Sequence, residues 1–403
     1  MDEALNERRF DLVVWGATGY TGGLVAEAVA ALAPPDLRWA VAGRDAARLE
    51  AVRDAIAPAV LVADAADPAS LAALARATRA VVTTVGPYAR YGTPLVAACV
   101  AAGTHVADLT GEPTWMRSTI ERFDVAARAS GVHVVHACGF DSVPSDLGVW
   151  WLQQRAFERH GRPCTRIEHV FGPMAGGVSG GTLASMLALF EDAVTDPTTR
   201  RQLGDRDLLA PGATPSVAVR DPLAPHREAV AGGWSVPFPM AAVNARVVRR
   251  TRALLGEPWG AGFRYRERWR FETWPIATAV ALVQALAPVA LAFAPVRRAL
   301  ARRLPAGARP DPEVRRHGSF RTTLVGWVDD EAEPLVGRVA SDLDPGYGAT
   351  SRMLAAMGIG LATDAFAGSP AGVVTPAVVG GAALVARLEA VGVRFRLDGE
   401  GDG

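Results

Sequence analysis

The sequence contains no lysine, so all 42 of its basic residues are arginines. Without an ε-amine, the chain cannot form a Schiff base with a carbonyl substrate or with pyridoxal phosphate, and it has no lysine general base. It also lacks the lysine that the phosphate-binding loops of nucleoside triphosphatases require. These absences exclude several classes of enzyme.

The chain also has few cysteines and no net charge. Cys99, Cys138 and Cys164 are the only cysteines, and their wide spacing argues against a disulfide framework and against a zinc or other metal site. The 42 basic residues balance 42 acidic ones, so we expect no nucleic-acid partner. The first ten residues are charged where a secretory signal would be apolar, which together with the cysteine pattern favours a cytoplasmic protein.

Half of the 403 residues are hydrophobic, and in the N-terminal part of the chain they follow a repeated strand-and-helix pattern. The apolar run from Phe10 to Trp15 leads into glycines and then into a helical stretch. Further strands are predicted at 38–42, 60–62, 80–85, 104–109 and 132–137, with helical stretches between the earlier ones. Alternating βα units with continuous apolar strands predict an α/β fold, in which residues 1–145 form a Rossmann-type doubly wound parallel sheet.

From Arg166 the sequence changes character. Strand-like stretches alternate with loops rich in proline, glycine and arginine, and predict a second, α+β domain over 146–345 for substrate binding or dimerisation. The long proline-containing loop 204–233 is expected to be a lid or a mobile surface excursion. Residues 346–403 have a helical period and are expected to pack back on the first domain.

A glycine-rich turn follows the first predicted strand. Gly16 permits a tight turn, Gly19 lets the backbone approach a pyrophosphate, and Gly22 allows close packing of the next helix. Ala17, Thr18, Tyr20 and Thr21 complete the sequence GATGYTG, and the helix that begins there offers N–H groups to phosphate. Because the turn follows a strand and opens a run of βα units, we interpret it as a dinucleotide-binding site; the alternative is a purely structural turn.

The end of the second predicted strand discriminates between the two nicotinamide cofactors. An acidic residue there would bind the ribose of NAD, but the sequence reads AGRD, with Arg44 in that position. A guanidinium suits a 2′-phosphate, so NADP(H) is the predicted cofactor. The alternative is that Arg44 is a solvated surface residue and that Asp45 begins the next helix.

Several longer motifs resemble a known family. They are GATGYTG, AGR at 42–44, VGPYARYG at 85–92, CVAAGTHVADLTGE at 99–112, GFDSVPSDLG at 139–148, GGVSGGTLAS at 176–185, DPGYGATSRML at 344–354 and GVVTPA at 372–377. Together they resemble the saccharopine dehydrogenase-like oxidoreductases, and within them the bacterial trans-acting enoyl reductases. The resemblance implies an NADP-binding domain and redox chemistry in the cleft beside a substrate domain. It implies cofactor contacts for Gly86 and Pro87, and an adenine contact for Asp64.

Reduction of an activated double bond needs a donor for the developing enolate oxygen and a source of protons. Tyr88 and Tyr91 are the candidate donors, and simple packing beside the cofactor is the alternative for each. Glu112, Asp141 and His136 are the remaining candidates for a proton relay. Asp141 and Ser142 precede Pro144 in a pattern typical of a helix cap. His136 ends an apolar strand and is more typical of a satisfied core histidine.

We therefore expect an NADPH-dependent enoyl reductase that acts on a small-molecule or carrier-bound acyl substrate of lipid, glycolipid or polyketide metabolism. One alternative is a saccharopine-type amino-acid oxidoreductase, although such enzymes commonly use a lysine. The alternating Arg264, Arg266, Arg268 and Arg270 could bind carboxylates, but they are more typical of a solvated or interface stripe. A second alternative is a lipid-surface protein without turnover.

The stretch from Ile276 to Val296 carries no charge and is followed by Arg297, Arg298, Arg302 and Arg303. It is long enough to span a bilayer, but Gln284 and two prolines interrupt it and a single fold is expected to continue on both sides. Burial in the core, a homodimer face and peripheral contact with a membrane remain as alternatives.

Overall fold

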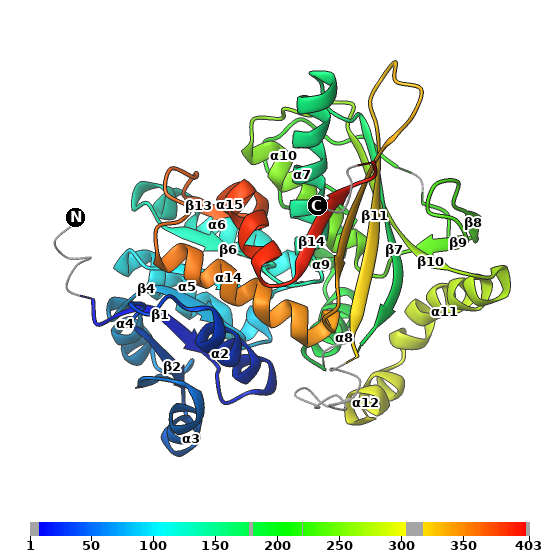
Figure 1. Cartoon of the computed structure of the whole chain (residues 1–403). Helices are drawn as coiled ribbons and strands as arrows, with labels where there is room; N and C mark the ends of the chain where they lie inside the picture. Colours follow the sequence, from blue (N-terminus) through cyan, green and yellow to red (C-terminus); the bar gives the residue numbers. More distant parts are fainter. Residues whose placement is uncertain (1–7, 177–179, 220, 304–316, 400–403) are drawn as a thin grey trace.

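The computed structural model describes residues 8–176, 180–219, 221–303 and 317–399 (Figure 1). Seven parallel strands form a first sheet, sheet A, in the order β13-β6-β5-β4-β1-β2-β3. Their bounds are β1 Phe10–Trp15, β2 Trp39–Gly43, β3 Val60–Val62, β4 Thr78–Thr83, β5 His105–Asp108, β6 His133–Val135 and β13 Gly372–Val374. The predicted doubly wound sheet is confirmed, since the strand order reverses between β1 and β4.

Helices cover both faces of sheet A. One face packs against α2 (Tyr20–Leu32), α3 (Ala46–Ile56) and α14 (Thr350–Ala362), and the other against α4 (Pro68–Arg76), α5 (Tyr88–Ala102) and α6 (Pro113–Ala129). Within β1, Leu12 and Val14 belong to the first core, whereas Val13 and Trp15 belong to the second. Burial on both faces is the reason why these strands are almost continuously apolar.

A second sheet, sheet B, has the order β14-β12-β11-β7-β10-β9-β8. The bounds are β7 Arg166–Ala175, β8 His226–Arg227, β9 Trp234–Pro237, β10 Arg264–Phe271, β11 Ser319–Trp327, β12 Leu335–Ser341 and β14 Val393–Leu397. Only β7 and β10 pair in parallel, and the other pairs are antiparallel. Helices α7 (Val143–His160) and α10 (Ala241–Leu254) pack on sheet B, α7 against β11 and β12 and α10 against β10. The remaining helices are α8 Gly180–Thr195, α9 Pro197–Gly204, α11 Trp274–Ala292, α12 Ala294–Arg303, the π-helix η1 Pro345–Ala349, and α15 Pro376–Ala390.

The C-terminal segment ties the two sheets together. Helix α14 lies across sheet A, where Gly358 permits close approach: a Cβ atom there would lie 2.4 Å from Cγ1 of Val82. The same segment then adds β13 to sheet A and β14 to sheet B. The helical period of residues 346–403 did not reveal these strands. The predicted domain boundaries at 145 and 345 stay predictions.

Two expectations about exposed regions are wrong. Arg268 is fully buried, and its guanidinium pairs with Asp221 and Glu228. The arginines of β10 therefore do not form a solvated stripe. The loop over 204–233 is anchored to the protein, because Leu208 and Leu209 are buried in the core beside sheet A. These anchors leave the first part of the loop unsuited to act as a lid.

Candidate active site

The carboxyl ends of the parallel strands bring most of the predicted site residues to one edge of sheet A. Gly16 follows β1, Arg44 follows β2, Gly86 follows β4, and Glu112 follows β5 by a short loop. Ligands of doubly wound folds bind beyond this edge, at the place where the strand order reverses. The site described below is therefore built from loops that a rigid sheet holds in place.

The three glycines of the first turn have different structural roles. Gly16 has φ +94°, and a Cβ atom there would lie 2.8 Å from Val85 Cγ2. A Cβ atom at Gly22 would lie 2.1 Å from the Gly16 carbonyl oxygen, so any larger residue would force α2 away from β1. Gly19 is exposed, and a Cβ atom there would meet only the Gly16 oxygen, at 3.3 Å. Gly16 and Gly22 are thus needed for the turn itself, and Gly19 keeps its outer surface clear for a ligand.

The N-terminus of α2 fits a phosphate group. No side chain caps it, and its first turn holds no acidic residue. Its first-turn N–H groups and the positive end of the helix dipole therefore face outward for an anion. Ala17 is buried beneath the turn, whereas Thr18, Tyr20 and Thr21 are half-buried around it. The Tyr20 ring packs edge-on against Tyr347 of η1, at 5.0 Å between centroids.

Arg44 and Asp64 lie at the ends of the paired strands β2 and β3. The Arg44 side chain is exposed and makes no hydrogen bond or ion pair with another described residue, which leaves its guanidinium available to a 2′-phosphate. Asp64 uses Oδ1 to accept the Ala66 N–H at 2.9 Å within its own turn. The adenine contact of Asp64 stays a prediction.

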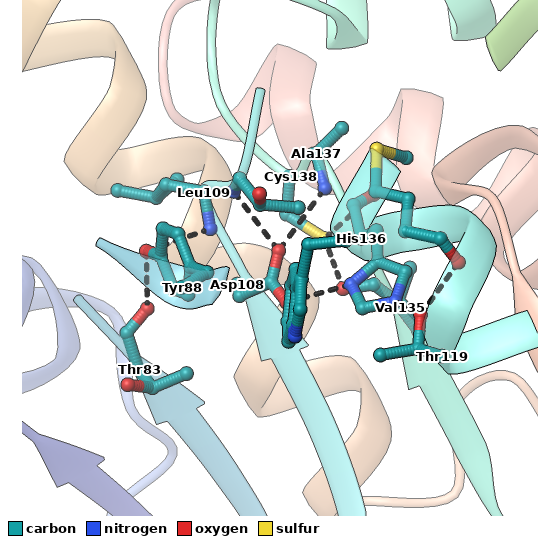
Figure 2. Close-up of polar contacts among 12 residues, drawn as sticks. Thr83, Tyr88, Asp108, Leu109, Thr119, Val135, His136, Ala137 and Cys138 are labelled. Carbon is teal, nitrogen blue, oxygen red and sulfur yellow. Dashed lines mark hydrogen bonds and ion pairs between the residues drawn. The ribbon is translucent and has the colours of Figure 1, made fainter. Parts of the chain in front are cut away.

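The Tyr88 hydroxyl is occupied by contacts within the protein. Its side chain is buried and stacks on Trp115, and its hydroxyl donates to the Thr83 carbonyl and accepts from the Leu109 N–H, both at 3.2 Å (Figure 2). Burial raises the pKa of Tyr88 well above its usual value. The hydroxyl proton is thus already used in tying β4 to the end of β5. This geometry speaks against a role for Tyr88 as donor to a substrate.

Tyr91 differs from Tyr88 in that its hydroxyl is available. It lies in the first turn of α5, where its N–H donates to the Pro87 carbonyl at 3.1 Å. The ring is half-buried beneath the Arg90 guanidinium, 5.2 Å from the ring centroid, and the hydroxyl has no hydrogen-bond partner among the described residues. Of the two candidate donors, only Tyr91 is free to donate to a substrate.

Glu112 caps helix α5. Its Oε1 accepts the Tyr88 N–H at 3.0 Å and its Oε2 accepts the Ala89 N–H at 2.8 Å. Ser185 of α8 donates a third hydrogen bond, at 2.7 Å, to Oε1. Both carboxylate oxygens are therefore already engaged in holding α5 and α8. The geometry assigns Glu112 a positioning role, which differs from the predicted catalytic one.

His136 is a satisfied core histidine at the end of β6. Its Nδ1 lies 2.7 Å from Asp108 Oδ2 and its Nε2 lies 2.7 Å from the Thr119 hydroxyl, which itself donates to the Met116 carbonyl (Figure 2). Asp108 and Thr119 were not singled out from the sequence, although Asp108 lies within the DLTGE motif. The network is fully buried and links β5, α6 and β6.

A second buried polar cluster lies between α7, α10 and sheet B. Glu267 accepts from the Tyr265 hydroxyl at 2.6 Å and from Asn244 Nδ2 at 3.0 Å, and burial raises its pKa to about 7. His169 Nδ1 lies 3.3 Å from the Tyr265 hydroxyl, and burial lowers its pKa to about 3. No sequence motif predicts this cluster, because its members come from distant segments.

The start of α7 also differs in detail from expectation. The helix begins with Ser142 as N-cap and Pro144 in its first turn, as the sequence predicts, but the Ser142 side chain makes no capping hydrogen bond. The Ser142 hydroxyl donates instead to Asn244 Oδ1 at 2.9 Å. Asp146 accepts from Thr251 and from the Ala377 N–H, which joins α7 to α10 and α15, and burial raises its pKa to about 7.

Comparison with known proteins agrees with this architecture. Residues 12–135 match the family described as "Saccharopine dehydrogenase NADP binding domain". A Mycobacterium tuberculosis protein, Rv2449c, whose name classes it provisionally as a trans-acting enoyl reductase, is 43% identical over 96% of this chain and 97% of its own length. The trans-acting enoyl reductase of Mycobacterium leprae is 37% identical with the same coverage. The chain belongs to the saccharopine dehydrogenase-like oxidoreductases.

The fold of this chain is also found among solved structures. The apo saccharopine dehydrogenase (L-Glu forming) of Saccharomyces cerevisiae superimposes with a TM-score of 0.54 over 96% of this chain and 99% of that chain, at 12% identity. This likeness shows the fold alone. The match to the NADP-binding family and the geometry of the glycine turn identify this saccharopine dehydrogenase-like protein as an oxidoreductase with NADP(H) as its cofactor.

Proposed function

We propose that the protein is an NADPH-dependent enoyl reductase that reduces an α,β-unsaturated acyl group in lipid or polyketide metabolism, in the cytoplasm. The acyl group would be a small thioester or one held by a carrier protein. The observation that carries the proposal is the similarity, over 96% of the chain, to proteins named trans-acting enoyl reductases. The free Tyr91 hydroxyl at the carboxyl edge of sheet A supports it.

The chemistry divides between the cofactor and the chain. When bound, NADPH supplies the hydride that adds to the β-carbon of the enoyl group. As the hydride adds, the electron pair of the double bond moves toward the acyl oxygen, and the Tyr91 hydroxyl donates a hydrogen bond to the enolate that forms. The α-carbon of the enolate then takes up a proton from water, which completes the reduction. A neutral phenol suits this role because it keeps its proton at physiological pH.

Glu112 acts on the same step through the helix that carries Tyr91. It holds the N–H groups of Tyr88 and Ala89, so it fixes the first turn of α5 and with it the direction of Tyr91. Its contact with Ser185 also fixes α8 beside the site. Loss of the carboxylate would loosen both helices without removing any reacting group.

The amino-acid alternative is less well supported. Three of the four arginines of β10 that could bind substrate carboxylates already have partners within the protein: Arg266 pairs with Glu168, Arg268 with Asp221, and Arg270 with Glu272. Arg264 is exposed at the start of the strand. The chain also has no lysine for an acid–base pair.

The direct test is turnover of NADPH with 2-enoyl thioesters of increasing chain length, followed by identification of the saturated product. Preference for longer chains would support a lipid or polyketide substrate. Reduction of NADP⁺ by an amino acid, with no reaction of any enoyl thioester, would favour the alternative. NADPH binding without turnover of either substrate would indicate a non-catalytic lipid-surface protein.

A further inference from the structure

Helix α11 is attached to the protein by one narrow face. Ala277 and Ala281 are buried against the edge of sheet B, and Gln284 donates to the Pro237 carbonyl of β9 at 3.0 Å. These residues recur at helical spacing and therefore lie on the same side of the helix. Of the alternatives that the sequence left open, burial of the whole stretch in the core is wrong, since the rest of the helix is largely exposed.

The opposite side of α11 is apolar and uncovered. Its exposed fractions are 59% for Leu282, 64% for Leu286, 62% for Val289 and 62% for Phe293 of the following turn. These four residues, the α11 face, follow one another at spacings of three or four and form one stripe. In Figure 1, α11 and α12 lie at the margin of the molecule, beyond the strands of sheet B. A contiguous apolar stripe of this kind marks an interaction surface.

The charged residues that follow α11 in the chain have one sign up to residue 310. No acidic residue occurs between Glu272 and Asp311 in the sequence. Directly after α11, Arg298 and Arg302 of α12 are exposed. Arg297 has a different role, because its guanidinium donates to the Leu291 carbonyl at 2.7 Å and lies 3.7 Å from Glu191 of α8. It holds α12, which carries the two exposed arginines, against α8 and α11.

None of the described residues covers this face, as its exposed fractions show. Residues 304–316, which lie outside the described residues, read LPAGARPDPEVRR, and residues 1–7 read MDEALNE. Both segments are rich in charge and poor in large apolar residues. An apolar stripe followed in the chain by exposed arginines that form no ion pair with a described residue matches the boundary between the acyl chains and the headgroups of an anionic bilayer.

Crossing the bilayer is excluded by the fold, although α11 is long and apolar enough to do so. The strand before it, β10, and the next strand after it, β11, both pair with β7 in sheet B. The chain therefore enters and leaves on the same side, and α11 can only lie parallel to a membrane surface.

We propose that the α11 face docks on an anionic lipid bilayer, with Leu286 and Phe293 in the acyl region and with Arg298 and Arg302 at the lipid phosphates. Helix α8 connects this surface with the site, because it packs on α11 and α12 and its Ser185 donates to Glu112. Docking would thus bring the bilayer to the outer end of a helix that leads to the carboxyl edge of sheet A. This last link rests on the proposed function, whereas docking itself does not.

The test is co-sedimentation of the full chain, without substrate, with phosphatidylcholine vesicles that contain phosphatidylglycerol and with vesicles of phosphatidylcholine alone. We expect binding to the anionic vesicles that weakens as salt is added. Leu286→Glu and Phe293→Glu should each weaken binding roughly tenfold or more, because each removes a buried apolar side chain from the lipid. Arg298→Gln and Arg302→Gln should each cost about fivefold on anionic vesicles only.

The matched control is Val125→Glu, which places the same charge on an 81% exposed valine of α6. It should bind vesicles as the unmodified chain does. Titration of every variant with NADPH checks that the variant is folded, because cofactor binding does not require lipid. The proposal is overturned if the unmodified chain stays in the supernatant at low salt, if Val125→Glu releases it equally, or if light scattering shows a dimer that Leu286→Glu dissociates and that does not bind vesicles.

Discussion

Arg44→Ala should remove the preference for NADPH over NADH. In the structure the Arg44 guanidinium is exposed at the end of β2 and has no partner among the described residues, so its whole hydrogen-bonding capacity is available to a 2′-phosphate. NADH lacks this phosphate. The substitution should therefore weaken NADPH and leave NADH unchanged.

The size of the effect follows from the exposure of the side chain. Hydrogen bonds to charged groups contribute about 1.5–3 kcal/mol, and an exposed, solvent-screened pair belongs at the lower end of this range. We therefore expect a loss of roughly tenfold in NADPH affinity, with a preference in the unmodified protein that declines as salt is added.

Calorimetric titration of both cofactors measures the effect. Arg48→Ala is the matched control, because Arg48 is exposed one turn into α3 and lies 3.4 Å from Asp45. It should change neither affinity. The reasoning fails if the unmodified protein binds NADH as tightly as NADPH, or if Arg48→Ala lowers NADPH affinity as much as Arg44→Ala does.

Three further predictions follow from the geometry of the site and of the buried acids. Tyr91→Phe should lower kcat about a hundredfold with NADPH affinity unchanged, whereas Tyr88→Phe should keep kcat and lower the free energy of unfolding by about 1–3 kcal/mol. Normal turnover by Tyr91→Phe would refute the donor assignment. Gly19→Val should fold normally and fail to bind NADPH, whereas Gly22→Ala should lower the thermal midpoint, because its Cβ would lie 2.1 Å from the Gly16 oxygen; retained binding by Gly19→Val would contradict the placement of the pyrophosphate. The folded pKa of Glu267, about 7 against a usual 4.5, means that the unfolded chain loses this proton first, so stability should fall as pH rises between these values. Glu267→Gln should reduce that slope by on the order of 1 kcal/mol per pH unit, as measured by urea unfolding, and an unchanged slope would count against the shift.

The part of the fold that the sequence reveals is the part that local pattern determines. Strands β1 and β3 have the predicted bounds, because a buried parallel strand is a short apolar run between turn residues. The family resemblance located the motifs at the carboxyl edge of sheet A. Strands β13 and β14 escaped prediction, because both are short and pair with strands far earlier in the chain.

The direction of individual side chains could not be predicted in the same way. Tyr88 and Tyr91 share one helical turn, and only the stacking of Trp115 on Tyr88 decides which phenol is buried. The capping of α5 by Glu112 depends on a loop that follows a different strand. The burial of Arg268 depends on partners from a distant loop and strand edge. Each of these contacts joins residues that local sequence does not relate.

The most direct test of the account is to follow the label from deuterated NADPH into the product of a 2-enoyl thioester. The unmodified protein should transfer one deuterium to the β-carbon, as seen by mass spectrometry and NMR of the saturated thioester. Tyr91→Phe should transfer it at the same position but about a hundredfold more slowly. A protein that binds NADPH and leaves every enoyl thioester unlabelled and unsaturated would contradict the assignment of enoyl reduction.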